Sequence, residues 1–365
     1  MGAKKAVSTA ARSLVHGKPH HAQWFITRKC NYKCLDCNIW EEQDEKELST
    51  EEIKRGMDIL KEAGIIELVL SGGNPLLRED IGEIIDYAVK HFVTTIYDNG
   101  SLASKKLDLL RKVDFVAISI DSLNVEKHDF IKNVPGAWQN AMQAVEELKK
   151  EGIKVCVAPT ISQINLYEIE ELTNYFTSKN IPILYGLYSY DATAEGSNQL
   201  FSIGRHKDEF VITDRKAMVK LCDTLLANRK TGKHLLITDK LLKTLKTLYA
   251  EGKRTWNCKA LQNFVVVDHL GRIAGCHNQT FAGSIFDLSK NWKSNEFNEQ
   301  REQYKTCTKC MYLCYIFYSL HGTPSGHLAL VKDQWKNASL LLKNNQNTKT
   351  NTTQHTPKKI PVNTD

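Results

Sequence analysis

Three cysteines form a compact group of potential metal ligands near the start of the chain. Cys30, Cys34 and Cys37 lie within eight positions, separated by three and then two residues. Thiolates at this spacing bind either zinc or an iron–sulfur cluster. A structural zinc site needs four ligands, but this loop supplies three, and the next histidine downstream is His91. Three thiolates on a four-iron cube leave one iron for a small molecule with an amine and a carboxylate. We therefore predict a [4Fe–4S] cluster with one open iron, with zinc as the alternative.

A second cysteine group occupies the last third of the chain: Cys258, Cys276, Cys307, Cys310 and Cys314. The alternating pattern between Cys258 and Cys276 predicts a β-hairpin with one cysteine at each end. An expected helix at residues 295–305 would carry the chain back to this hairpin. Thiolates from the hairpin and from the CxxC pair Cys307 and Cys310 could then enclose one metal centre. We leave Cys314 as either a substitute ligand or a core residue, and zinc again as the alternative metal.

Composition places the chain among ordinary globular proteins of a reducing compartment. It has 365 residues, of which 42% are hydrophobic and 25% charged, and ten cysteines. No apolar stretch approaches the roughly 18 residues that a membrane span requires, and the N-terminus lacks a signal-peptide core. We predict a cytoplasmic protein with no nucleic-acid partner. The net charge of +7 comes from the two ends of the chain. The basic N-terminal segment predicts either weak membrane association or a solvated extension.

Apolar runs alternate with helical patterns through the first half of the chain. Expected strands lie at residues 22–27, 65–70, 93–100, 115–122, 153–161 and 181–190. Strands separated by helices form a parallel sheet with right-handed crossovers. Six units fall short of the eight in a closed barrel. We predict an α/β fold: a partial (β/α)6 barrel of parallel strands with a small C-terminal α+β auxiliary-cluster domain. The active site should lie at the C-terminal ends of the strands.

Five segments are expected along the chain, in the order that the patterns change. They are a basic extension (1–21), the partial barrel (22–210), a helical linker (211–250), a cluster domain (251–330) and a helix end with a disordered tail (331–365).

The first cysteine group, placed directly after the first expected strand, resembles that of the radical S-adenosylmethionine (radical SAM) superfamily. The resemblance implies that the open iron binds the amine and carboxylate of S-adenosylmethionine. It also implies reductive cleavage to methionine and a 5′-deoxyadenosyl radical, which takes a hydrogen atom from the substrate.

Three further loops extend the resemblance: SGGNP at 71–75, DNG at 98–100 and SIDS at 119–122. They are similar to the family's glycine-rich turn, the end of its third strand and its ribose-binding motif. The implied cofactor-binding residues are Gly72, Gly73, Asn74, Pro75, Asn99, Ser119 and Asp121. This chain departs from the family at three positions, with Asn74 in place of Glu, Asp36 before the third cysteine and Lys132 where Arg is common.

The spacing Cys258-x12-Gly271-x4-Cys276 looks like the start of the SPASM and twitch extensions, which carry auxiliary [4Fe–4S] clusters. Five cysteines are too few for a full SPASM domain, so we predict one auxiliary cluster. The resemblance implies a radical SAM oxidoreductase or maturase acting on a peptide or small metabolite, with an electron donor such as ferredoxin or flavodoxin. The alternatives are a non-catalytic iron–sulfur electron-transfer or binding protein, and a porphyrin- or lipid-modifying radical SAM enzyme. The sequence names no catalytic side chain.

Overall fold

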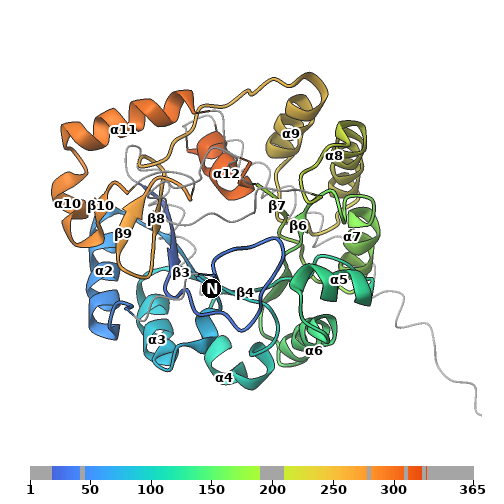
Figure 1. Ribbon diagram of the computed structural model, residues 1–365, viewed down its shortest axis with the longest axis horizontal. Helices are drawn as coiled ribbons and strands as arrows, with labels where there is room; N and C mark the ends of the chain where they lie inside the picture. Colours follow the sequence, from blue (N-terminus) through green and yellow to red (C-terminus); the bar gives the residue numbers. More distant parts are fainter. Residues whose placement is uncertain are drawn as a thin grey trace, which may run out of the picture.

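The computed structural model describes residues 19–41, 46–189, 209–277, 281–307, 311–322 and Gly326. One eight-stranded sheet dominates this part of the chain, in the order β10-β9-β8-β1-β2-β3-β4-β5. Its strands are β1 (His21–Phe25), β2 (Glu67–Ser71), β3 (Val93–Asp98), β4 (Phe115–Ile118), β5 (Val155–Val157), β8 (Phe264–Val267), β9 (Arg272–Ala274) and β10 (Gly283–Ser284). A second pair, β6 (Thr160–Ile161) and β7 (Gly186–Leu187), continues the curve (Figure 1).

Helices surround the strands on the outside, as Figure 1 shows for α2 to α8. The α-helices are α2 (Thr50–Ala63), α3 (Ile81–His91), α4 (Leu107–Leu110), α5 (Val125–Lys132), α6 (Ala137–Lys150), α7 (Ile169–Ser178), α8 (Arg215–Lys230), α9 (Asp239–Glu251), α10 (Leu288–Asn291), α11 (Asn295–Thr306) and α12 (Leu313–His321). Short 3-10 helices are η1 (Pro75–Leu77), η2 (Ala103–Lys105) and η3 (Ile285–Asp287). A capping box opens α2, since Ser49 and Glu52 bond reciprocally.

The predicted parallel α/β fold is confirmed, because β1 to β5 pair in parallel in sequence order. The last two expected strands are broken up. The stretch 153–161 divides into β5 and β6 at Pro159, which has no N–H to donate to a ladder. The stretch 181–190 contributes only the two residues of β7 and an isolated bridge at Ile183, which touches Val157 and Leu235.

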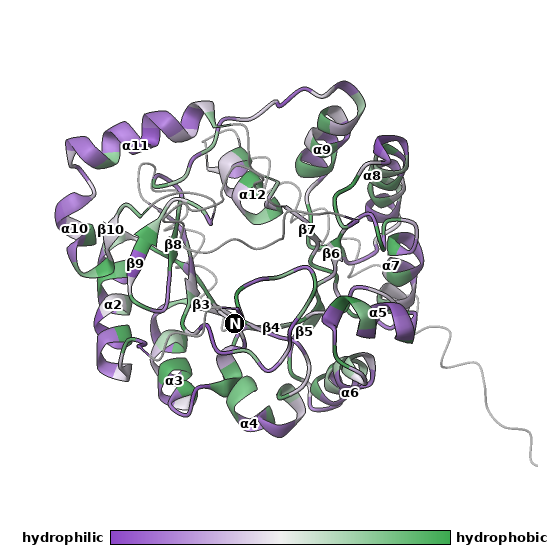
Figure 2. Cartoon of the chain, viewed as in Figure 1, coloured by the Kyte–Doolittle hydropathy of each residue, from purple (hydrophilic) through white to green (hydrophobic). Residues whose placement is uncertain are grey.

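The two faces of the central strands are covered unequally. On β2 and β3, every second residue is buried, and Leu68, Leu70 and Ile96 belong to the main core. The alternate residues, among them Glu67 and Val69, are only half-buried. Hydrophobic residues concentrate on the inward sides of the surrounding helices in Figure 2. The core therefore lies mainly between sheet and helices. Among the described helices, none has the length and apolar character to cross a bilayer.

The C-terminal hairpin is part of the barrel sheet. The predicted hairpin is present as β8 and β9, which pair antiparallel across a turn in which Gly271 adopts φ +75°. Strand β8 also pairs in parallel with β1, from His21 opposite Phe264 to Trp24 opposite Val267. Trp24 fixes the same junction, because its indole N–H donates to the carbonyl of Asp268 at 3.1 Å. The expected boundary at residue 251 remains a prediction, but the segments on either side share one sheet.

Candidate functional site

The first cysteine loop runs from the end of β1 toward α5. Its three thiols are free and half-buried. Trp40 stabilises the backbone of this loop, because its indole N–H donates to the carbonyls of Cys34 (3.2 Å) and Cys37 (2.9 Å). Burial raises the pKa of Cys37 to about 12, and the negative charge of Asp36 adds to this effect. A high pKa is expected of thiols that ionise only when they bind metal.

The arrangement of the thiols suits a cluster better than a single ion. Within the described ranges, no three or more His, Cys, Asp or Glu side chains converge closely enough to hold one metal ion. In a four-iron cube each thiolate has its own iron, so the three sulfurs do not need to meet at one point. The donor set of Cys30, Cys34 and Cys37 therefore fits the predicted [4Fe–4S] cluster.

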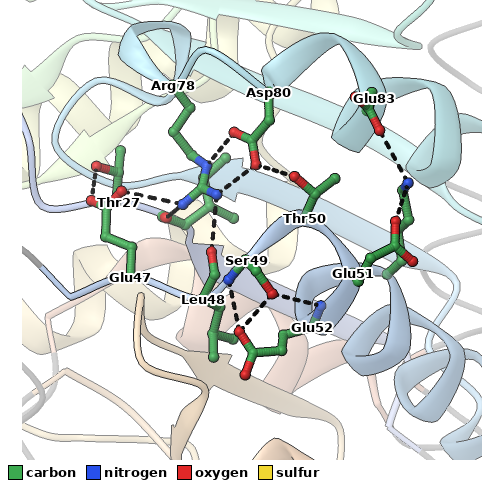
Figure 3. Close-up of polar contacts among 12 residues, drawn as sticks. Thr27, Glu47, Leu48, Ser49, Thr50, Glu51, Glu52, Arg78, Asp80 and Glu83 are labelled. Atoms are coloured by element: carbon green, nitrogen blue, oxygen red, sulfur yellow. Dashed lines mark hydrogen bonds and ion pairs between the residues drawn. The ribbon is translucent and has the colours of Figure 1, made fainter.

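Arg78 fastens both ends of the cysteine loop. Its guanidinium donates to the carbonyl of Ile26 (3.0 Å), where the loop begins, and to that of Leu48 (3.0 Å), where it ends. The carboxylates of Asp80 (2.7 Å) and Glu47 (3.3 Å) balance its charge. Figure 3 shows Arg78 between Asp80 and these loop residues. No motif marked Arg78 in the sequence, because it acts through backbone carbonyls that carry no sequence signal.

Replacing Arg78 with methionine should destabilise the fold and reduce the iron retained on anaerobic purification. Breaking a buried ion pair by removing one partner costs about 3–5 kcal/mol, and here two carbonyls also lose their donor. Urea unfolding of the anaerobic protein measures the loss. The matched control is Arg111→Met, whose side chain is half-exposed and pairs with Glu151, and which should cost about 1 kcal/mol or less. Equal losses in the two variants would contradict the role of Arg78.

The glycine turn after β2 lies directly against the backbone that enters the cysteine loop. The N–H of Gly73 donates to the carbonyl of Thr27 at 2.8 Å, and that of Asn74 donates to Lys29 at 2.7 Å. A Cβ on Gly73 would stand 2.2 Å from the carbonyl oxygen of Lys29 and 2.6 Å from that of Arg28. Gly72 is equally confined, because its Cβ would stand 2.3 Å from the Thr27 oxygen. Only glycine permits this approach.

Replacing Gly73 with alanine should therefore push the turn away from the cysteine loop. We expect a loss of about 3 kcal/mol in unfolding free energy, at the upper end for overpacking, because the clashing atoms are backbone. The control is Gly82→Ala in α3, where the nearest atom is the flexible end of Leu109 at 3.3 Å. That variant should be neutral or more stable, since alanine favours a helix. Urea unfolding and iron content measure both, and an unchanged Gly73→Ala protein would contradict the close approach.

Three loops meet at the buried side chain of Asn74. Its amide donates to Asp98 (2.8 Å), to Asn31 of the cysteine loop (3.3 Å) and to Asn99 (3.3 Å). Asn99 in turn donates to Asn31 at 3.1 Å. Pro75, the next residue, is buried and begins η1. The structure thus brings the predicted residues Asn74, Pro75 and Asn99 together and adds Asn31 and Asp98, which were not among the implied cofactor-binding residues.

Lys132 is a second buried cation near the cysteine loop. Its ammonium lies 2.5 Å from the carboxylate of Asp121 and donates to the hydroxyl of Ser119 at 2.9 Å. Asp121 also accepts from the backbone N–H of Thr160 at 2.7 Å. Ser119 and Asp121 are therefore engaged with the protein itself, and their contact with a nucleotide remains a prediction. Burial raises the pKa of Asp36 to about 6, although the nearby charge of Lys132 opposes this shift.

Three of the later cysteines lie near Tyr304 on α11. Burial raises the pKa of Tyr304 above its usual range, and the neighbouring thiols of Cys276, Cys258 and Cys307 contribute to the shift. The N–H of Gly275 donates to this hydroxyl at 3.2 Å. The structure thus gathers the hairpin cysteines with Cys307. Cys310 lies outside the described residues.

Cys314 lies on another face of α12. Ser319 of α12 contacts Cys258, whereas Tyr318 of the same helix donates to the carboxylate of Glu67 on β2. Cys314 is one turn from Tyr318, on the same helix face, and about 140° around the helix from Ser319. The exposed thiol of Cys314 therefore points to the same side of α12 as Tyr318. Cys314 is not among the cysteines that affect the pKa of Tyr304. Ligation by Cys314 remains a prediction.

Comparison with known proteins supports the same interpretation. Residues 24–175 match the family described as the Radical SAM superfamily. An AdoMet-dependent heme synthase of Oleidesulfovibrio alaskensis is 33% identical over 174 residues, covering 46% of this chain and 45% of that protein. The antilisterial bacteriocin subtilosin biosynthesis protein AlbA of Bacillus subtilis is 30% identical over 178 residues, covering 47% and 39%. The chain thus spans less than half the length of these curated relatives.

A solved structure extends the likeness beyond the barrel. Streptococcus suis SuiB, bound to its precursor peptide SuiA, superposes with a TM-score of 0.62 at 17% identity, covering 82% of this chain and 70% of that one. At this identity the likeness concerns the fold, which includes the predicted partial barrel. The family implies a [4Fe–4S] cluster and S-adenosylmethionine as cofactors, as predicted. The matched residues include the three-cysteine loop, the glycine turn and the strand ends that surround Lys132, so this part of the chain is similar to the radical SAM superfamily of enzymes.

Proposed function

We propose that Cys30, Cys34 and Cys37 hold a [4Fe–4S] cluster whose open iron binds S-adenosylmethionine, and that the enzyme removes a hydrogen atom from its substrate. The observation that carries this proposal is a loop of three thiols, clamped at both ends by Arg78 and packed against a glycine turn at the C-terminal edge of a parallel sheet. When bound, the cluster and S-adenosylmethionine supply an electron and the 5′-deoxyadenosyl radical.

The protein's own residues shape and charge this edge of the sheet. The absence of side chains at Gly72 and Gly73 lets this turn pack directly against the backbone of residues 27–29, which holds the start of the cysteine loop at this edge. Asn74 fixes the loops after β1, β2 and β3 relative to one another. Lys132 places a positive charge close to Cys34 and Asp36, where it offsets the charge of ionised thiolates. We assign Asn99, Ser119 and Asp121 to the surround of the bound nucleotide.

An auxiliary [4Fe–4S] cluster held by Cys258, Cys276, Cys307 and Cys310 is the second part of the proposal. The proposal is supported by the position of Cys258, Cys276 and Cys307 near Tyr304. We assign it to electron transfer with the substrate, and we expect a ferredoxin or flavodoxin to reduce the enzyme. Association of residues 1–21 with a membrane stays a prediction, since residues 1–18 lie outside the described part.

We favour a peptide substrate. AlbA, named as a bacteriocin biosynthesis protein, and SuiB, solved with its precursor peptide, are both similar to this chain. The similarity to a heme synthase supports a porphyrin as the second candidate. A peptide encoded beside the gene and an iron porphyrin are the two probes to compare. The substrate is the one that increases 5′-deoxyadenosine formation and gains or loses mass in the same reaction.

Anaerobic incubation of the reconstituted protein with dithionite and S-adenosylmethionine tests the central proposal. We expect methionine and 5′-deoxyadenosine in equal amounts, measured by chromatography and mass spectrometry. A protein that carries its full iron but forms no 5′-deoxyadenosine would contradict the enzyme proposal and favour the non-catalytic iron–sulfur alternative.

A further inference from the structure

The side of β2 and β3 that points away from the surrounding helices is partly uncovered. Its residues alternate with those that pack in the main core, and we call them the inner face. The inner face consists of six half-buried residues: Glu67, Val69, Ser71, Val93, Thr95 and Tyr97. It ends at Ser71, directly before the glycine turn that packs against the cysteine loop. A substrate that reaches the cysteine edge along this side of the sheet therefore meets these side chains.

Glu67 is the acidic residue of the inner face, and it is held through one carboxylate oxygen. Tyr318 of α12 donates its hydroxyl to Oε2, and Nδ1 of His21 lies 3.8 Å from the same atom. Burial opposes ionisation, but His21 and Tyr318 outweigh it and lower the pKa of Glu67. In the part of the chain that the structure describes, Oε1 accepts no hydrogen bond, and no lysine or arginine pairs with Glu67. The side chain is 44% exposed, so Oε1 can accept a charge-assisted hydrogen bond from a ligand.

Two valines next to Glu67 leave apolar surface beside this carboxylate. Val93 lies directly opposite Glu67 on β3, and Val69 follows two residues later on the same side of β2. Among the described residues, neither valine packs into a hydrophobic cluster. A carboxylate next to uncovered apolar surface matches a side chain with an aliphatic stem and a charged head. Lysine and arginine have this form.

We infer that Glu67, Val69 and Val93 bind a lysine or arginine side chain of the substrate. The inference rests on the proposed function, and it narrows the favoured peptide substrate to one with a basic residue. From Glu67 to Ser71 the strand rises about 13 Å, so the basic residue is bound away from the cysteine edge. It contributes to binding and register, while the reacting carbon lies elsewhere. The same carboxylate repels anionic ligands, which disfavours a porphyrin that carries carboxylates.

Binding of three blocked peptides tests the inference. They are acetylated and amidated pentapeptides of alanine whose central residue is lysine, norleucine or glutamate, so that only this residue varies the charge. Titration of the reconstituted protein with millimolar peptide, followed by saturation-transfer NMR, measures their binding. We expect the lysine peptide to bind about tenfold more tightly than the norleucine peptide, and the glutamate peptide to bind most weakly. Glu67→Gln, whose amide oxygen can still accept from Tyr318, should remove the preference for lysine.

The matched control is Glu62→Gln on α2, which makes the same change in net charge at an exposed position and should keep the preference. Loss of the preference in Glu67→Gln alone supports the inference. No preference in the parental protein, an unchanged preference in Glu67→Gln, or an equal loss in both variants overturns it. A lower unfolding free energy of Glu67→Gln with the preference intact would limit Glu67 to fastening α12, which also overturns it. Peptide binding needs no turnover, so a protein that forms no 5′-deoxyadenosine contradicts the proposed function while this comparison still decides the role of Glu67.

Discussion

Replacing Cys30, Cys34 and Cys37 together with alanine should abolish formation of 5′-deoxyadenosine and remove about half of the bound iron. The activity is lost because the loop after β1 would keep none of the three thiols proposed to hold the first cluster. The iron that remains belongs to the proposed auxiliary cluster. Iron analysis and the anaerobic dithionite assay measure the two quantities on the same preparation.

Cys222→Ala is the control for this first prediction. Cys222 is a buried thiol on α8 in the hydrophobic core, and its charged neighbours are Asp223 and Lys246. It should keep full iron and full activity, at the cost of a small cavity. Undiminished iron and visible absorbance in the triple alanine variant would contradict the assignment of the first cluster. Loss of all iron in this variant would agree with the assignment of the first cluster and contradict the proposed auxiliary cluster.

Replacing Lys132 with methionine should lower the unfolding free energy by about 3–5 kcal/mol, because Asp121 would lose the cation that balances it. Asp121 is 1% exposed, so water cannot take the place of the lost partner. Lys132→Arg, which restores the family's usual residue and keeps the charge, should retain most of the stability. Urea unfolding under anaerobic conditions measures the difference.

The double variant sharpens this second prediction. Lys132→Met combined with Asp121→Asn removes the charge from both partners and should cost less than the two single changes together. Lys127→Met on the same helix is the matched control. Its ion pair with Glu168 is roughly 30% exposed on both sides and should contribute about 1 kcal/mol or less. A loss from Lys132→Met no greater than that from Lys127→Met would contradict the role of the buried pair.

Local patterns predicted most of the scaffold. The alternation of apolar runs and helical patterns located β1 to β4 to within a few residues. The interrupted strands at the end of the barrel were harder to predict from the sequence. Pro159 gives a local signal, but the isolated bridge from Ile183 to Leu235 depends on a segment more than fifty residues away. Pairings of that kind leave no periodic trace in the sequence.

Some residues of the candidate site could likewise be predicted from the sequence, and others could not. Ligands of one chemical type at short spacing, such as the first three cysteines, can be recognised from sequence. Arg78 and Asn31 could not be, because they act through carbonyls and amides of distant segments. Lys132 was noted only as a departure from the family. Its buried pairing with Asp121 became evident once α5 had been placed against the ends of β4 and β6.

The parallel pairing of β8 with β1 has a consequence for electron flow. Each thiol group is attached to this one ladder, the first through the loop after β1 and the second through the ends of the hairpin. Neither can swing away without breaking backbone hydrogen bonds on a central strand. We therefore expect the separation between the two proposed clusters to stay constant during turnover, so that the tunnelling rate between them depends on their potentials and not on a hinge.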